Sequence, residues 1–215
     1  MQPLVKYLVA AGAGSGRTSA ALVMAGHVKV NDHTASSLMQ PVKTGDQVKV
    51  SETLLKNPSF DSVYLILHKP LGYLTAVSDD RSRPTVMNLM PPEMKISGLV
   101  PVGRLDLETT GLLLMTNDGQ LAYRLTHPRY RVEKEYHVVL DKPLNASQKQ
   151  RLLQGIQLTT NLARIVEIKR LPGRMRYAMT LTQGEKRQIR LMAAAVGLSV
   201  KELKRVRIGD LHLSH

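Results

Sequence analysis

Apolar side chains recur at helical spacing at the start of the chain and then at every second position. Leu4 and Leu8 share one face of an expected helix, and the glycine-rich residues 12–16 interrupt it. Residues 18–25 predict a second short helix that ends at a glycine. Alternating strands are expected at residues 27–30 and 47–50. These elements predict a small α/β module over residues 1–52.

A polar stretch that contains Asn57-Pro58-Ser59 breaks this pattern and predicts a linker over residues 53–61. The remaining residues, 62–215, alternate apolar strands with amphipathic helices. Strands are expected at residues 63–67, 112–116, 134–140, 163–168 and 177–181, and helices at residues 120–126, 146–155 and 186–196. Runs of strands with helices between them predict an α+β fold, with a mainly antiparallel central sheet flanked by helices.

The positive charge is concentrated in the C-terminal part of the chain. Residues 1–120 carry 11 Lys and Arg against 10 Asp and Glu, a net charge of +1, whereas residues 121–215 carry 19 against 7, a net charge of +12. Such a field favours a polyanion such as nucleic acid, bound with salt-dependent affinity. An acidic substrate, ribosome association and a basic surface that only confers solubility stay open as alternatives.

Composition excludes several kinds of chemistry. The sequence has no Cys, which rules out disulfides, thiolate catalysis and Cys-ligated zinc. It also lacks the P-loop and dinucleotide-binding glycine patterns. No apolar run reaches the roughly 18 residues of a membrane span, and the N-terminus lacks a secretory pattern. We therefore expect a cytoplasmic protein that does not engage a membrane.

Asp106 is the strongest candidate for chemistry. It ends the run Gly103-Arg104-Leu105-Asp106, which precedes the strand expected at residues 112–116. A carboxylate on a loop held by a rigid strand can act as a nucleophile or as a general base. An isolated Arg-x-Asp is more often a turn cap or an ion pair, so this run does not decide the function alone.

Tyr136 is a second candidate, in the alternating segment Glu133 to Val138. Alternation places its ring on the face opposite Glu135 and His137, where it could stack on a nucleobase. A half-buried strand tyrosine is the simpler interpretation of this segment alone.

A third candidate is the basic segment Lys186 to Arg190. On the helix expected there, Lys186 and Arg190 share one face, and Arg187 lies about 100° around the axis from Lys186. These side chains could contact phosphate, or one arginine could pair with a buried carboxylate. A solvated basic helix end is the simpler alternative.

Taken in order along the chain, these motifs resemble the RsuA-like family of ribosomal RNA pseudouridine synthases. The resemblance rests on Gly103 to Asp106, the strand that follows, Asn117-Asp118-Gly119, Lys134-x-Tyr136 and Arg187-Gln188-Ile189-Arg190. His68-Lys69-Pro70, Arg83-Pro84-Thr85-Val86 and His127-Pro128 fit the same family. Residues 1–52 resemble the S4-like RNA-binding domain, so residues 62–215 would be the catalytic domain.

The resemblance implies a role for each candidate. Asp106 would start the cleavage of the uridine N-glycosidic bond, and Tyr136 would stack on the base and help to remove its C5 proton. Arg190 would pair with Asp106 and keep it ionised. The target uridine must be flipped out of the helix. The reaction that the resemblance implies needs no metal and no cofactor, which agrees with the missing P-loop and dinucleotide-binding patterns. RNA contacts are expected from Arg17, Lys69, Arg104, Lys134, Lys186 and Arg187.

The implied partner is ribosomal RNA or a ribosomal assembly intermediate, and we expect a monomer that acts on large-subunit rather than small-subunit RNA. Two other functions compete with this one. A non-catalytic RNA-binding or ribosome-assembly protein would keep the fold, but would not need Asp106, Tyr136 and Arg190 together. A glycoside hydrolase would need a second carboxylate at a defined distance from Asp106, and Glu108 is the only nearby candidate.

Overall fold

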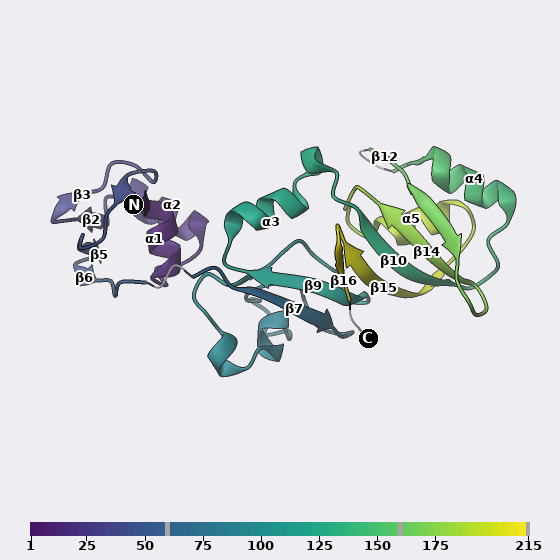
Figure 1. Cartoon of the computed structure of the whole chain (residues 1–215), viewed down its shortest axis with the longest axis horizontal. Coiled ribbons are helices and arrows are strands. Elements are labelled where there is room, and N and C mark those ends of the chain that lie inside the picture. Colours follow the sequence, from purple (N-terminus) through teal and green to yellow (C-terminus); the bar gives the residue numbers. More distant parts are fainter. Residues whose placement is uncertain (59–60, 159–160, 214–215) are drawn as a thin grey trace. The chain divides into compact units, whose positions relative to one another are not determined.

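The chain forms two compact units, each with its own buried core (Figure 1). The computed structural model describes residues 1–58, 61–158 and 161–213. The first unit comprises Met1–Val63 and Pro91–Val100, and the second comprises Tyr64–Met90 and Pro101–His215. Residues 59–60, in the expected linker, lie outside the described residues.

The first unit combines two helices with short strands around one apolar core. Its elements are β1 (Gln2–Pro3), α1 (Leu4–Ala10), α2 (Gly16–Met24), β2 (Val28–Val30), β3 (His33–Thr34), β4 (Pro41–Val42), β5 (Val48–Val50), β6 (Thr53–Leu54) and the 3-10 turn η2 (Pro92–Met94). Four strands form an antiparallel sheet in the order β3-β2-β5-β6, and β1 pairs with β4. Leu4 and Leu8 are fully buried, which confirms the apolar face expected for α1.

Two boundaries of this unit differ from the sequence pattern. The side chain of Ser15 accepts a hydrogen bond from the backbone N–H of Thr18 at 3.1 Å, so α2 begins at Gly16, earlier than expected. Part of the expected linker is structured, because β6 pairs with β5. In the same stretch, the Tyr7 hydroxyl donates to the Asn57 side chain at 3.0 Å.

The second unit is built on an eight-stranded sheet. Its strands are β7 (Tyr64–Lys69), β8 (Val100–Pro101), β9 (Thr110–Thr116), β10 (Lys134–Leu140), β13 (Glu167–Arg170), β14 (Arg176–Leu181), β15 (Val200–Ile208) and β16 (Leu211–His212). The order is β13-β14-β10-β15-β9-β7, with β16 beside β15 and β8 beside β9. Along this path only β15 and β9 are parallel, which confirms the mainly antiparallel sheet.

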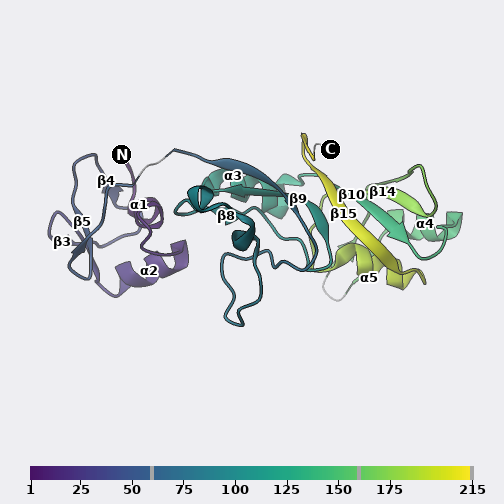
Figure 2. The ribbon, with the colours of Figure 1, turned by 90° about the horizontal axis from the view of Figure 1, so that it is seen from below.

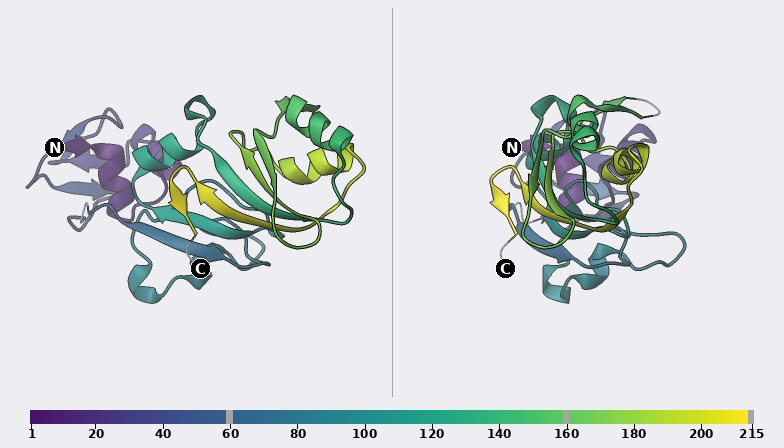
Figure 3. Two further views of the ribbon diagram at one scale, coloured as in Figure 1. Left: turned by 45° about the vertical axis from the view of Figure 1, so that its right-hand side comes forward. Right: turned by 90° about the vertical axis from the view of Figure 1, so that its right-hand side faces the viewer.

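The second unit also contains helices and short 3-10 turns. They are α3 (Gly119–Thr126), α4 (Ala146–Gln154) and α5 (Gln188–Ala195), with the 3-10 turns η1 (Val86–Leu89) and η3 (Pro128–Tyr130). Leu152 of α4 and Met192 of α5 share a core with Val138 of β10 and Met179 of β14, so α4 and α5 lie on the same side of these strands (Figure 3). In the described ranges, none of the helices is long and apolar enough to cross a membrane.

Two elements expected from the sequence are wrong. Residues 163–168 do not form one strand: β12 (Leu162–Ala163) pairs with β11 (Ile156–Gln157), and β13 begins only at Glu167. The last helix starts at Gln188 rather than at residue 186, because Arg187 adopts a left-handed backbone conformation with φ of 56°. Lys186 and Arg187 therefore lie in the turn before α5.

A β-bulge interrupts the pairing of β15 with β10, two strands that run side by side (Figure 2). Tyr136 is opposite Arg205, and Glu135 is opposite Arg207, so Val206 is an extra residue without a partner on β10. Neighbouring residues of a strand point to opposite faces. The bulge therefore directs Arg205 to the face of Tyr136 and Arg207 to the face of Glu135.

Candidate active site

The loop that carries Asp106 connects β8 to β9, and hydrogen bonds from Lys69 and Thr75 hold its backbone in place. The Lys69 ammonium donates to the carbonyl oxygens of Pro70 at 3.0 Å, Asp106 at 3.2 Å and Thr109 at 2.9 Å. The Thr75 hydroxyl donates to the Leu105 carbonyl at 2.7 Å and accepts from the Leu105 N–H at 3.2 Å. The backbone is thus fixed on both sides of Asp106, and its carboxylate stays free of these bonds.

The structure contradicts the prediction that Lys69 binds RNA. Its side chain has an exposed fraction of 0% and its ammonium is enclosed by three carbonyl oxygens. Burial lowers the pKa of Lys69, and the nearby Asp106 carboxylate opposes that shift. Lys69 is a positioning residue for the loop, and the sequence could not reveal this because all three acceptors are backbone atoms.

Asp106 and Tyr136 line the same cavity, which has a volume of about 560 Å³. This volume is typical of small-ligand sites. Four segments of the second unit contribute to its wall: the loop at Arg104 to Asp106, β10 at Lys134 and Tyr136, β15 at Leu203 and Arg205, and the turn before α5 at Lys186 and Arg187. In the part of the chain that the structure describes, no hydrogen bond or ion pair occupies the Asp106 carboxylate.

Strand alternation explains how Tyr136 reaches this cavity. Val138, two residues further along β10, is buried beneath α4 and α5. Tyr136 points to the same side, but it lies where α5 begins, so its ring is only half-buried and borders open space. The interpretation that Tyr136 faces away from Glu135 agrees with this arrangement.

Arg190 does not pair with Asp106, so that prediction is wrong. Its guanidinium donates through Nη2 to the Glu108 carbonyl at 2.9 Å and through Nη1 to the Val200 carbonyl at 3.0 Å. Its Nε lies 3.7 Å from the Glu108 carboxylate. From the first turn of α5, the side chain reaches the end of the Asp106 loop and the start of β15. Arg190 therefore ties these segments together without lining the cavity.

The basic residues expected to bind RNA separate into exposed and enclosed groups. Arg104, Lys186 and Arg187 are exposed at the cavity, although Arg187 also donates to the Glu108 carboxylate at 3.1 Å. Lys134 is half-buried in the cavity wall, and burial together with the charge of Arg205 lowers its pKa. Arg17 lies in the other unit, exposed on the first turn of α2.

The charge of the cavity wall is strongly positive. Five cations line it, namely Arg104, Lys134, Lys186, Arg187 and Arg205, against the two acids Asp106 and Glu185, a net charge of +3. A concave surface with this balance attracts an anionic ligand. Arg205 was not among the residues singled out in the sequence, because the segment from Val200 to Leu213 has no regular alternation.

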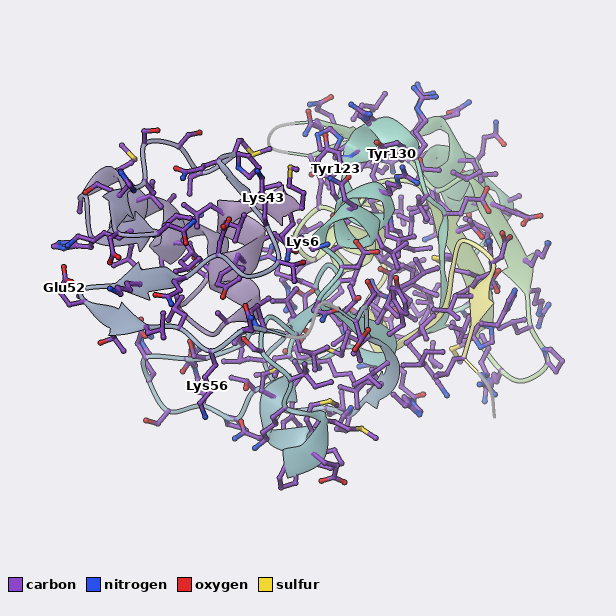
Figure 4. The ribbon with its side chains drawn as sticks, turned by 60° about the vertical axis from the view of Figure 1, so that its left-hand side comes forward. Lys6, Lys43, Glu52, Lys56, Tyr123 and Tyr130 are labelled. Atoms are coloured by element: carbon purple, nitrogen blue, oxygen red, sulfur yellow. The ribbon has the colours of Figure 1, made fainter. Side chains whose placement is uncertain are left out.

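An exposed aromatic cluster lies beside Thr126 and Pro128, which also line the cavity. The rings of Tyr123 and Tyr130, labelled in Figure 4, are 5.9 Å apart at nearly a right angle. The Arg129 guanidinium lies 4.6 Å from the centre of the Tyr130 ring. Exposed rings interleaved with a cation form a surface suited to unpaired nucleobases.

Comparison with known families agrees with this geometry. Residues 63–195, more than half of the chain, match the family model described as RNA pseudouridylate synthase. Residues 2–48 match the S4 domain.

The chain belongs to the RNA pseudouridylate synthase family.

Relatives align with nearly the whole chain. A protein of Aquifex aeolicus named as an uncharacterized RNA pseudouridine synthase is 36% identical over 210 residues, which cover 98% of this chain and 87% of the relative. The ribosomal large subunit pseudouridine synthase B of Bacillus subtilis is 33% identical, with 99% of this chain and 88% of the relative covered. The enzyme of the same name from Pseudomonas aeruginosa is 36% identical, and this chain spans only 56% of its length.

One solved structure supports the same family, and a second has a similar fold. A crystal structure of a pseudouridylate synthase superimposes with a TM-score of 0.67 and 27% identity, and the alignment covers 100% of this chain and 91% of that one. A chain of an H/ACA ribonucleoprotein bound to a substrate RNA superimposes with a TM-score of 0.50 at 15% identity over 69% of this chain, which reflects the fold alone.

Proposed function

We propose that this chain isomerises uridine to pseudouridine in ribosomal RNA, and that its substrate is large-subunit RNA. The observation that carries this proposal is that Asp106 and Tyr136 line one cavity in a member of this family, and that the Asp106 carboxylate has no hydrogen-bond or ion-pair partner among the described residues. The substrate assignment is supported by the relatives from B. subtilis and P. aeruginosa, which are named for the large ribosomal subunit.

In this proposal Asp106 starts the reaction. The anchored loop places the carboxylate beside the ribose carbon that bears the base, which lowers the entropic cost of reaching the transition state. Tyr136 stacks on the flipped-out uracil and takes part in the removal of the C5 proton. The detached base turns within the cavity and rejoins the ribose through its C5 carbon.

In this proposal, exposed side chains around the cavity and on the first unit bind the RNA that surrounds the target uridine. Arg104, Lys186 and Arg187 bind phosphates beside the cavity, and the rings of Tyr123 and Tyr130 stack on bases that flank the target. On the first unit, Arg17 joins exposed lysines in an RNA-binding surface. The lysines labelled in Figure 4 are Lys6, Lys43 and Lys56.

The protein is further proposed to act as a cytoplasmic monomer with neither a metal nor a cofactor. A chelator should therefore leave the rate of pseudouridine formation unchanged. The elution volume of the protein should match one chain of 23.8 kDa.

Asp106→Asn tests the proposed function. The amide keeps the size of the side chain but removes the negative charge, so the variant should bind large-subunit RNA as tightly as the parent and form no pseudouridine. Asp210→Asn is the matched control, because Asp210 is exposed outside the cavity and the same chemical change there should have no effect. Pseudouridine is mapped in a large-subunit transcript and in assembly intermediates after incubation with each protein.

Three results would contradict the proposal. One is normal pseudouridine formation by Asp106→Asn. Another is the absence of pseudouridine with the parent protein on every ribosomal RNA tested. The third is release of free uracil from the RNA, which would indicate hydrolysis of the glycosidic bond.

A further inference from the structure

The guanidinium of Arg205 is buried in the cavity wall with most of its hydrogen-bonding capacity unused. The side chain has an exposed fraction of 3%. Its Nε donates to the Leu112 carbonyl at 2.8 Å, which is its only hydrogen bond in the described ranges, and Nη2 is buried without a partner. A guanidinium carries five N–H donors. Burying a charged group with so few hydrogen-bond partners costs free energy unless a ligand supplies the missing acceptors.

No acid of the site neutralises Arg205. In the part of the chain that the structure describes, no ion pair links it to Asp106 or Glu185, which line the same cavity. The half-buried Lys134 is a further cation close enough for the charge of Arg205 to lower its pKa. The enclosed end of the cavity is therefore selective for an oxygen-rich or anionic group.

Both neighbouring strands fix the position of Arg205. On one side it is opposite Tyr136 across β10, because of the bulge at Val206. On the other side it is opposite Gly111 of β9, where an added Cβ atom would clash with the Arg205 carbonyl oxygen. Only glycine permits this close approach, so the two strands hold Arg205 rigidly beside the ring of Tyr136.

We propose that Arg205 binds the target uracil, donating to one of its carbonyl oxygens and stabilising the negative charge of the base when the glycosidic bond breaks. This inference rests on the proposed function. Phosphates are a less suitable ligand, since the exposed cations Arg104, Lys186 and Arg187 are better placed for the RNA backbone. Arg205 instead adjoins Tyr136, the residue proposed to stack on the base.

The electron balance of the reaction explains why a cation is useful there. When the bond between C1′ and N1 breaks, its electron pair stays on the base, and C1′ becomes electron-deficient beside the Asp106 carboxylate. The charge of the base spreads over N1 and both carbonyl oxygens. C5 then bonds to C1′, the C5 proton leaves and N1 gains a proton. A buried donor aimed at one carbonyl oxygen stabilises the charged stage more than the starting uridine.

The test combines the variant Arg205→Met with RNA in which sulfur replaces one uracil oxygen. Sulfur accepts hydrogen bonds weakly, so 2-thiouridine and 4-thiouridine each remove one acceptor. With normal RNA, the variant should lose about 100-fold in kcat, as on removal of one preorganised donor, while KM changes by less than about threefold. One of the two thio substrates should slow the parent by about tenfold or more and slow the variant by less than about threefold.

Arg207→Met is the matched control for this experiment. Arg207 lies on the same strand but faces the other way and pairs with Glu133 at 2.9 Å and Glu135 at 3.3 Å. Arg207→Met should lower the melting temperature, and 2-thiouridine and 4-thiouridine should slow this variant as much as they slow the parent. If Arg205→Met fails to fold, Arg205→Lys provides the same comparison, and a reduced thio effect again supports the proposal.

Equal slowing of parent and variant by both thio substrates would overturn the proposal, because Arg205 would then contact neither carbonyl oxygen. This failure is distinct from failure of the proposed function. An inactive parent contradicts the isomerase itself, whereas an active parent without the coupling contradicts only the role of Arg205.

Discussion

Lys69 and Arg205 are both buried cations next to the Asp106 loop or its cavity, and they differ in how far their donors are satisfied. Lys69 donates to three backbone carbonyls, whereas Arg205 donates to one. The first cation has used its capacity within the protein and acts as an anchor. The second retains capacity and faces the place where a ligand binds. Burial alone therefore does not separate structural from functional cations, but the count of unused donors does.

Lys69→Met is expected to have the largest effect of the variants compared here. It tests whether Lys69 only anchors the loop or also contacts the substrate. We expect the variant to lose about 100-fold in kcat, because a loosened loop misplaces Asp106. Stability should fall by about 1–3 kcal/mol, since three carbonyl oxygens lose their donor. The slowing by thiouridine should match that of the parent, and steady-state kinetics with thermal unfolding measures both effects. A changed response to thiouridine would place Lys69 at the substrate instead.

The pH dependence of kcat/KM in Arg205→Met tests whether the charge of Arg205 acts on Lys134. Burial and the charge of Arg205 lower the pKa of Lys134, which the sequence motifs predict to contact RNA in its protonated form. Removing that charge in Arg205→Met should raise the pKa of Lys134, so the alkaline fall of kcat/KM should move to higher pH. The measurement compares the profiles of parent and variant between neutral and alkaline pH. An unchanged alkaline limb would mean that Lys134 does not contribute to it.

Lys186→Gln should have the smallest effect, because this cation is exposed and neither anchors the loop nor lies deep in the cavity. The slope of log affinity against log salt concentration should become shallower by about 0.7 to 0.9, as expected for one lost phosphate contact, with kcat unchanged. Fluorescence titrations of an RNA fragment at several salt concentrations measure the slope. An unaltered slope would remove Lys186 from the RNA surface.

Much of the fold follows from local pattern. The strand expected at residues 134–140 coincides with β10, and the helix expected around Leu4 and Leu8 is α1. Both have a regular apolar face that packs onto a core, so periodicity is a sufficient guide. The prediction of one strand over residues 163–168 was wrong because the apolar positions there belong to two strands with different partners.

The site was predictable only in part. Asp106 and Tyr136 were identified through their motifs, and the structure brings both to one cavity. The partners of Arg190 were not predictable, because Glu108 is distant in sequence and the acceptors at Glu108 and Val200 include backbone carbonyls. Arg205 gave no local signal, since its orientation depends on an extra residue that only strand pairing reveals.

That extra residue, Val206, changes the phase of β15. Before it, Leu203 and Arg205 share the face of the cavity; after it, the next residue on that face is Ile208, three positions further along. Simple alternation would point Arg205 and Arg207 to the same face. Because of Val206 they point to opposite faces, with Arg205 directed at the ligand and Arg207 held by Glu133 and Glu135. A strand without the extra residue would need two consecutive arginines to serve both tasks.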